Sequence, residues 1–287
     1  MRALFVGAGD TGVRAARELV ALGWEVHALR RSERPVPEPL VSHRADITDL
    51  DALARVEVPD VDVLVVCVSA GRSDEAAYRG VYVDGVANVL ATLRARRGLP
   101  ERVVFVSTTA VYGQCQGELV VESSPTRPTR FNGTVMLEAE SQIAECGADV
   151  RVLARLGGIY GPGRTRLLDR VRNGEEHLDA AARDAHTNRV HVDDAARAIA
   201  FLVSHERPPA VVNVVDDEPA RRSEVVRWLA RELGVAVPET SGGRATPAAP
   251  TERVDDKRVS NALLRSLGFV PRYPTYRDGY RSVLAGS

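Results

Sequence analysis

The 287-residue chain carries a formal charge of -1, from 38 basic and 39 acidic side chains, which excludes the strongly basic surface of most nucleic-acid-binding proteins. Its length allows one large domain, or a nucleotide-binding domain with a smaller appendage. The cysteines Cys67, Cys115 and Cys146 are far apart and odd in number, so we expect a reducing compartment, no disulfide framework and no metal site.

No apolar run approaches the roughly 18 residues of a membrane span, and the chain enters an apolar segment after Arg2 without a charged leader. We therefore expect a cytoplasmic protein with a small-molecule substrate and with no nucleic-acid or membrane partner. Lys257 is the only lysine, which excludes any mechanism that needs a second one.

Short β-branched runs alternate with amphipathic helical stretches, a pattern that predicts an α/β fold with a parallel sheet covered on both faces. The expected strands span 3–6, 25–29, 63–68, 103–106, 150–154 and 210–214. The expected helices span 13–22, 78–96, 131–146 and 193–202. The stretch 241–250 is rich in glycine, proline and alanine, so we expect it to be a mobile loop.

A G-x-G-x-x-G pattern follows the first expected strand and opens the first expected helix, with the members Gly7, Gly9, Asp10, Thr11 and Gly12. Glycines permit a tight turn and close backbone approach, and the N-terminus of a helix attracts a diphosphate. The pattern therefore predicts dinucleotide binding. The alternative is a turn that only packs the helix on the strand.

The second expected strand ends in Arg30 and Arg31, about 20 residues beyond the glycines, where an acid would hold the ribose hydroxyls of NAD and an arginine the extra phosphate of NADP. We predict NADP as the cofactor. The acidic residue Glu33 leaves NAD open as the alternative cofactor. Either arginine could also be a solvated side chain that binds no phosphate.

Six further segments resemble, in order, motifs of the extended short-chain dehydrogenase/reductases, the NAD-dependent epimerase/dehydratase family. They are 45–49, 68–70, 106–113, 155–163, 190–194 and 213–219. The resemblance implies that Asp46 and Ile47 contact adenine, and that Val68, Ser69 and Ala70 lie beneath the nicotinamide ribose. It also implies that His191, within 190–194, is structural rather than catalytic or metal-binding.

The motifs predict a Rossmann-type, doubly wound parallel sheet with a small C-terminal substrate-binding cap. Residues 1–163 and 187–215 are expected to form the dinucleotide-binding domain, and residues 164–186 and 216–287 the cap. By the same resemblance, the helices 78–96 and 131–146 could pair two subunits in a homodimer.

In this family a Ser or Thr positions the substrate oxygen, a Tyr exchanges a proton with it, and a Lys four residues later lowers the tyrosine pKa from about 10. The spacing to Tyr112 gives the hydroxyl role to Thr108. The tyrosine and lysine positions fall on Arg130 and Thr134, so the sequence predicts that this pair is missing.

The replacement for that pair stays open in the sequence. Arg130 could act as an electrostatic clamp for a carboxylate or an oxyanion, or could be an exposed arginine at the start of a helix. Tyr112, Tyr160, Asp184 and His186 are candidate acids, and the imidazole of His186 has the most suitable intrinsic pKa. The predicted catalytic residues are Thr108, Arg130, Tyr112 and His186.

Three functions follow from this site. The first is an NADP-dependent oxidoreductase or epimerase-like enzyme with a non-standard proton relay, acting on a small carbonyl or hydroxyl substrate such as a sugar nucleotide or a secondary metabolite. The second is a non-redox cyclase, isomerase or lyase of secondary metabolism, and the third is a dinucleotide-sensing regulatory protein. Thr109 and Ala110 replace the acidic pair of the family's dehydratases, so sugar-nucleotide dehydration is disfavoured.

Overall fold

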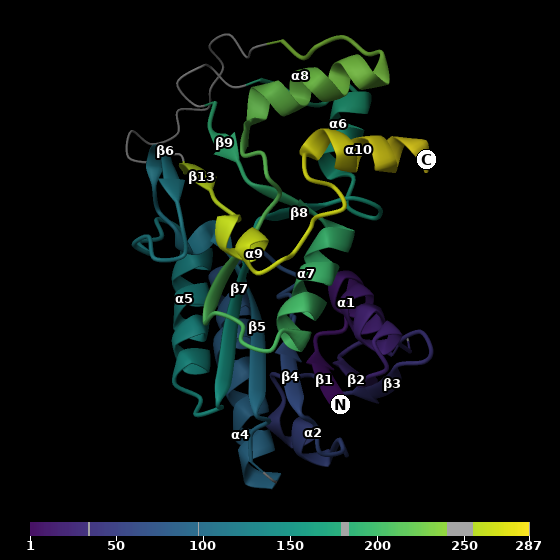
Figure 1. Ribbon diagram of the computed structural model, residues 1–287, viewed down its shortest axis with the longest axis vertical. Helices are drawn as coiled ribbons and strands as arrows, with labels where there is room; N and C mark the ends of the chain where they lie inside the picture. The colour runs from purple at the N-terminus through teal and green to yellow at the C-terminus, as the bar shows by residue number, and fades with distance from the viewer. Residues whose placement is uncertain (34, 97, 179–183, 240–254, 287) are drawn as a thin grey trace.

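The computed structural model of the protein describes residues 1–33, 35–96, 98–178, 184–239 and 255–286 (Figure 1). The stretch 241–250, which the sequence predicts to be a mobile loop, lies outside the described residues. Within the described ranges, no helix combines the length and apolar character needed to cross a bilayer.

A parallel seven-stranded sheet forms the centre of the molecule, in the order β11-β7-β5-β4-β1-β2-β3 (Figure 1). Its strands are β1 Arg2–Val6, β2 Glu25–Arg30, β3 Val41–Arg44, β4 Val63–Val66, β5 Arg102–Thr108, β7 Val150–Leu156 and β11 Val211–Val214. The predicted parallel sheet is confirmed, and β3 joins the six expected strands as an edge strand beside β2.

Helices cover both faces of this sheet. They are α1 Asp10–Ala21, α2 Leu50–Arg55, α3 Glu75–Tyr78, α4 Val86–Arg96, α5 Phe131–Ala144 and α7 Val192–Ser204. The helix expected at 78–96 is longer than predicted, because α3 and α4 are joined by a π-helical turn, η1 (Arg79–Gly85). Such turns are rare within helices and are frequent at functional sites.

Neighbouring residues of a strand enter different cores, because successive side chains point to opposite faces of a sheet. In β1, Ala3 and Phe5 pack in the core shared with α1 and α7. Leu4 and Val6 pack in the opposite core, which is shared with α2, α4 and α5. A strand buried on both faces therefore has a continuous apolar sequence, as in residues 3–6 of β1.

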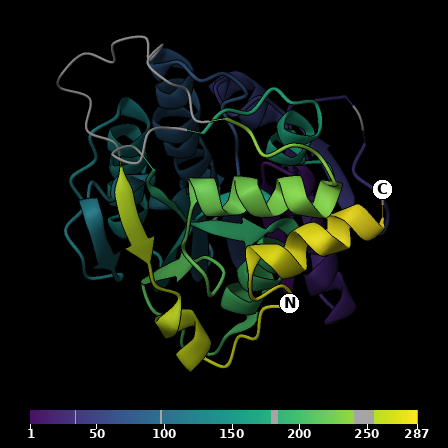
Figure 2. The same cartoon turned by 90° about the horizontal axis from the view of Figure 1, so that it is seen from above.

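Three further helices gather beyond the carboxyl ends of the strands (Figure 1). They are α6 Arg166–Arg172, α8 Arg222–Leu233 and α10 Tyr276–Ala285. Seen from above, α8 and α10 lie side by side (Figure 2), and the rings of Trp228 and Tyr276 meet at 5.6 Å. These helices share their own hydrophobic core, and we call this part the cap.

Short segments connect the cap with the sheet. They are η2 Thr109–Val111, β6 Cys115–Val120, β8 Gly158–Tyr160, β9 His186–Thr187, β10 Arg189–His191, β12 Ala220–Arg221, β13 Asp256–Val259 and α9 Ala262–Ser266. Within the C-terminal part, Leu264 of α9 and Phe269 pack in the sheet core instead of the cap core. The domain boundaries stay a prediction.

The order of the strands in the sheet indicates where a ligand would bind. From β1 the chain continues to β2 and β3 on one side, whereas β4, β5, β7 and β11 lie on the other side. In open α/β sheets, ligands bind beyond the carboxyl ends of the strands at the point where the order reverses. The segments that follow β1 and β4 meet at this point.

Candidate dinucleotide and substrate site

The glycine turn between β1 and α1 has two packed glycines and one open glycine. Gly7 has a φ of 91°, and an added Cβ would meet the backbone of Cys67. A Cβ at Gly12 would come 2.7 Å from the carbonyl oxygen of Gly7. At Gly9, which is also the N-cap of α1 and lacks a capping side chain, nothing lies within 4 Å of an added Cβ. The helix therefore presents its first N–H groups to open space, as diphosphate binding requires.

A cavity of about 240 Å³ runs from this turn past the ends of β2 and β4, and we call it the first cavity. Its lining includes eight residues that the sequence assigns to the dinucleotide, namely Gly7, Gly9, Arg30, Arg31, Asp46, Ile47, Val68 and Ser69. These residues come from four separate segments of the chain. The structure therefore brings the predicted diphosphate, ribose and adenine contacts together.

The end of β2 is positively charged at this cavity. Arg31 is 68% exposed and lies 3.6 Å from the carboxylate of Asp46, which also accepts hydrogen bonds from the backbone N–H and hydroxyl of Thr48 at 3.0 and 2.8 Å. Burial raises the pKa of Asp46, but these bonds and Arg31 outweigh it, so the pKa is lowered overall. Glu33 pairs with Arg44 at 2.9 Å and does not line the cavity.

A second cavity of about 280 Å³ opens on the other side of the turn. Its lining shares Gly9, Val68 and Ser69 with the first cavity and adds Asp10, Thr11, Gly12, Tyr78, Tyr82, Thr108, Asn132 and Arg164. The Oγ1 of Thr108 accepts a hydrogen bond from the backbone N–H of Ala110 at 3.2 Å, which leaves the hydroxyl proton free to be donated. Ala70, the remaining predicted cofactor contact, is buried and lines neither cavity.

Tyr112 belongs to a buried network rather than to a cavity. Its side chain is fully buried, and its hydroxyl donates to Asn213 at 2.8 Å and accepts from Arg155 at 2.9 Å. Arg155 in turn donates to both carboxylate oxygens of Glu140, at 2.9 and 2.6 Å. Burial raises the pKa of Tyr112. This geometry does not support the prediction that Tyr112 is a replacement acid, because its hydroxyl links Asn213 of β11 to Arg155 of β7.

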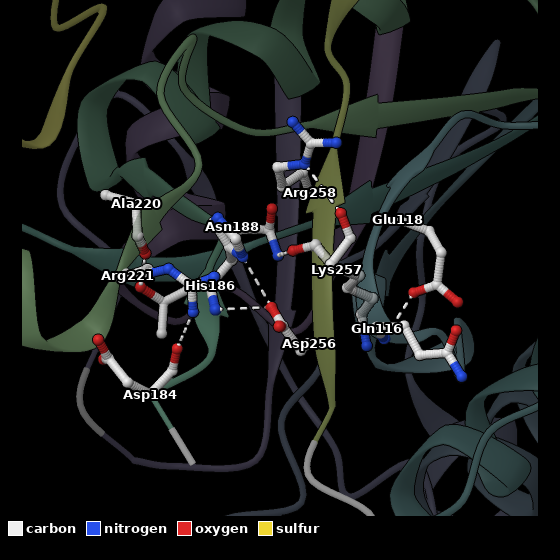
Figure 3. Close-up of polar contacts among 12 residues, drawn as sticks. Gln116, Glu118, Asp184, His186, Asn188, Ala220, Arg221, Asp256, Lys257 and Arg258 are labelled. Atoms are coloured by element: carbon white, nitrogen blue, oxygen red, sulfur yellow. Dashed lines mark hydrogen bonds and ion pairs between the residues drawn. The ribbon is translucent and has the colours of Figure 1, made fainter. Parts of the chain in front are cut away.

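A third cavity of about 590 Å³ lies between the sheet and the cap, and we call it the cap cavity. It borders the second cavity, because Ile159 and Arg164 line both. His186 lines the cap cavity, and Figure 3 shows its ring against Asp256 of β13. The Nδ1 atom of His186 lies 2.7 Å from Asp256 Oδ1, and the backbone N–H of His186 donates to the same oxygen at 2.9 Å.

The pairing with Asp256 fixes the His186 ring. Burial raises the pKa of Asp256, whereas its bonds to His186 lower it by more, so the carboxylate is charged. A charged carboxylate holds the proton on Nδ1, which leaves Nε2 for another partner. This is the arrangement that an acid–base imidazole needs.

The candidate acids Asp184 and Tyr160, and the structural His191, are each held by local contacts. The carboxylate of Asp184 caps α8 by accepting from the N–H and the hydroxyl of Ser223, at 2.9 and 2.6 Å. The hydroxyl of Tyr160 lies 3.4 Å from the carbonyl oxygen of Thr275, and burial raises its pKa beyond the usual range. His191 is buried, and its Nδ1 accepts from the N–H of Asp193 at 3.2 Å as the N-cap of α7.

Arg130 is the N-cap of α5 and is exposed. It lines none of the three cavities described above. Its positive charge nevertheless lowers the pKa of Lys257, a residue of β13 that does line the cap cavity.

Several residues of these cavities have no motif in the sequence. Tyr78, which ends α3, and Tyr82, within the π-helical turn, lie four residues apart and line the second cavity. That spacing predicts a shared helical face, and Arg164 directly follows the Gly161-Pro-Gly163 turn. Asp256 and Lys257 follow a long segment without a clear pattern, so no local signal assigns them to the site.

Known proteins are similar to this chain in sequence and in fold. The model of the NAD dependent epimerase/dehydratase family matches residues 4–214. Protein YeeZ of Escherichia coli K12 is 29% identical over 284 residues, which cover 94% of this chain and 95% of YeeZ.

Two solved structures extend the likeness to the whole chain. A protein of Methylobacillus flagellatus, described as a candidate NAD-dependent epimerase/dehydratase, is 37% identical, with a TM-score of 0.80 over 99% of this chain and 98% of its own. The UDP-glucose 4-epimerase of Thermus thermophilus, solved with NAD, is 23% identical and has a TM-score of 0.81 over 99% and 98%. The latter similarity concerns the fold.

Proposed function

Because the chain belongs to the NAD-dependent epimerase/dehydratase family, we propose that it is an NADP-dependent oxidoreductase or epimerase-like enzyme for a small carbonyl or hydroxyl substrate. The observation that carries this proposal is the continuity of the cavities. The second cavity begins at the open glycine turn and shares Ile159 and Arg164 with the cap cavity. A dinucleotide on the turn would thus present its nicotinamide to a separate space for substrate.

The residues present fit a dinucleotide. Gly9 leaves room for a diphosphate, the N-terminus of α1 faces it, and Val68 and Ser69 line both cavities between the turn and Thr108. When bound, a nicotinamide supplies or accepts a hydride. The protein's part is to hold the substrate carbon beside it, to exclude water and to provide the proton.

NADP is favoured over NAD by the charges at the end of β2. Arg30 and Arg31 line the first cavity, and the nearby Glu33 is paired with Arg44. An exposed guanidinium can donate two hydrogen bonds to a phosphate, whereas the ribose hydroxyls of NAD would call for an acceptor.

Thr108 and His186 are the proposed catalytic residues. Thr108 orients the substrate oxygen with its hydroxyl, and the imidazole of His186, with its ring fixed by Asp256, exchanges protons between solvent and the cap cavity. Arg130, which is exposed, is proposed to act on the site through its field rather than by contact.

Calorimetric titration with NADPH and NADH tests this function. We expect NADPH to bind more tightly, and we expect Arg30→Ala and Arg31→Ala to weaken NADPH binding by about 10- to 100-fold each, because one charge-assisted bond contributes roughly 1.5–3 kcal/mol. Binding of NADH should change little in either variant. A preference for NADH would remove the role of both arginines.

Turnover separates the enzyme from the other candidate functions. We expect the wild-type protein to oxidise NADPH with at least one member of a panel of carbonyl compounds. The loss of the absorbance of the reduced nicotinamide measures this oxidation. Tight NADPH binding without oxidation across the panel would instead support a non-redox enzyme or a dinucleotide sensor.

A further inference from the structure

Lys257, the only lysine of the chain, enters the cap cavity from β13. There it lines the same space as Thr109, which directly follows Thr108, and His186. Figure 3 shows Lys257 on β13, next to the contact between Asp256 and His186. The side chains of Lys257 and His186, which can each carry a proton, therefore line the same cavity.

The strand that carries Lys257 is held in place without its side chain. β13 pairs with β6 through the backbone along its whole length. The side-chain amide of Asn188 adds two bonds to the backbone of β13, donating to the carbonyl oxygen of Lys257 at 3.0 Å and accepting from the N–H of Val259 at 2.7 Å. These contacts hold β13 without using the ammonium group of Lys257.

The ammonium group is buried and incompletely paired. The side chain of Lys257 is 7% exposed, its Nζ donates to the carbonyl oxygen of Tyr112 at 2.6 Å, and the carboxylate of Asp255 lies 3.7 Å away. Asp255 also accepts from the hydroxyl of Thr129 at 3.2 Å, so its charge is shared. An ammonium has three N–H groups, so at least one of them is not used by these two partners.

The surroundings also ease the loss of a proton. Burial lowers the pKa of Lys257, Asp255 raises it, and the positive charge of Arg130 lowers it further, with a lowered pKa as the result. A lysine with a lowered pKa gives up its proton more readily than an exposed lysine does.

We infer that Lys257 is the catalytic residue that gives a proton to the substrate oxygen, or takes it back in the reverse direction. The inference rests on the proposed function and deepens it, since it names the group that meets the reacting oxygen. His186 then exchanges protons between solvent and the cavity. Lys257 reaches the site from β13, far along the chain from the helix in which the sequence predicts a missing tyrosine and lysine.

The step balances with a reduced nicotinamide dinucleotide as the co-reactant. The carbonyl carbon of the substrate accepts a hydride, the electron pair of the C=O double bond moves to the oxygen, and this oxygen takes one proton from Nζ. The products are the alcohol, the oxidised dinucleotide and a neutral amine. The amine regains its proton from solvent, through His186.

Because the chain has a single lysine, labelling with lysine that carries 13C at Cε gives one side-chain signal to titrate by NMR. We expect Lys257 to titrate below the ordinary lysine value of about 10.4, and we expect Arg130→Ala to raise that pKa. The titration needs no substrate. A Lys257 signal that titrates at or above the ordinary value in the folded protein would overturn the inference.

Two variants then separate charge from proton transfer. Lys257→Arg keeps the charge but cannot give up a proton, and Lys257→Met removes both. We expect both variants to bind NADPH within about threefold of the wild type and to lose about 100-fold or more in kcat with the carbonyl that the wild-type protein reduces. The melting temperature of Lys257→Arg serves as the control for folding.

The outcomes distinguish the inference from the function on which it rests. If the wild-type protein oxidises NADPH and Lys257→Arg does so equally well, the ammonium group only provides charge. The inference then fails, while the proposed function stands. If the wild-type protein binds no dinucleotide, the proposed function fails first and the inference with it.

Discussion

Two glycines of the turn after β1 differ in what an added methyl group would meet. Gly12 is packed against the carbonyl oxygen of Gly7, whereas Gly9 faces open space. Gly12 therefore serves the fold, and Gly9 leaves room for a ligand. The motif alone does not separate these two roles.

Substitution of each glycine by alanine tests this difference. Gly9→Ala should leave stability within about 0.5 kcal/mol, because the new methyl meets nothing in the free protein, yet it should weaken NADPH binding at least about tenfold. Gly12→Ala should cost about 1–3 kcal/mol of unfolding free energy through overpacking. Urea denaturation and calorimetry measure the two effects, and unchanged NADPH affinity in Gly9→Ala would place the diphosphate elsewhere.

At the scale of elements, one buried ion pair joins three of them. Glu140 of α5 binds Arg155 of β7 and accepts from the hydroxyl of Ser107 in β5 at 2.6 Å. The side chains of Glu140 and Arg155 are 5% and 7% exposed. This contact ties α5 to the end of the strand that carries Thr108.

Glu140→Ala should therefore destabilise the protein by about 3–5 kcal/mol, since it leaves the charge of Arg155 buried without its carboxylate. Glu138 provides the matched control, because it pairs with Arg79 at 2.6 Å where both side chains are about 40% exposed or more. Glu138→Ala should cost about 0–1 kcal/mol. Equal losses in the two variants by urea denaturation would contradict this account.

How well an element could be predicted depends on how local its pattern is. The six strands with continuous apolar runs were found, and several extend further than predicted, such as β5 to Thr108. β3 has the polar, largely exposed sequence Val-Ser-His-Arg, so its pattern does not differ from that of a loop. Only its pairing with β2 makes it a strand.

The candidate site divides in the same way. The predicted dinucleotide contacts lie in short motifs next to predicted strands. Eleven of these residues line the two cavities, and Ala70 alone falls outside the linings. The pair of His186 and Asp256 joins residues 70 positions apart in the chain. No local pattern encodes that contact, and the same holds for Lys257.

For the molecule as a whole, buried histidines link stability to pH. Burial and the charge of His27 lower the pKa of His43, which lies 2.8 Å from His27, and burial lowers the pKa of His191. The unfolded chain therefore binds protons at higher pH than the folded one. Their contribution to stability is complete above the unfolded value of about 6.5 and falls as the pH drops below it.

We expect the unfolding free energy, measured in urea, to decrease between pH 7.5 and pH 5.5. His43→Gln should reduce that decrease, because it removes one of the shifted groups without adding a charge. A free energy that stays constant over this range in the wild-type protein would be inconsistent with these pKa directions. A homodimer through the helices 78–96 and 131–146 stays a prediction, and sedimentation of the folded protein measures it.

We propose above all that the open glycine turn holds a dinucleotide whose nicotinamide end lies in the second cavity. A crystal structure of the complex with NADPH tests it most directly. We expect the diphosphate at the N-terminus of α1 beside Gly9, the 2′-phosphate on Arg30 or Arg31, and the nicotinamide next to Thr108. A dinucleotide bound elsewhere, or a turn closed by side chains in crystals grown with excess NADPH, would contradict it.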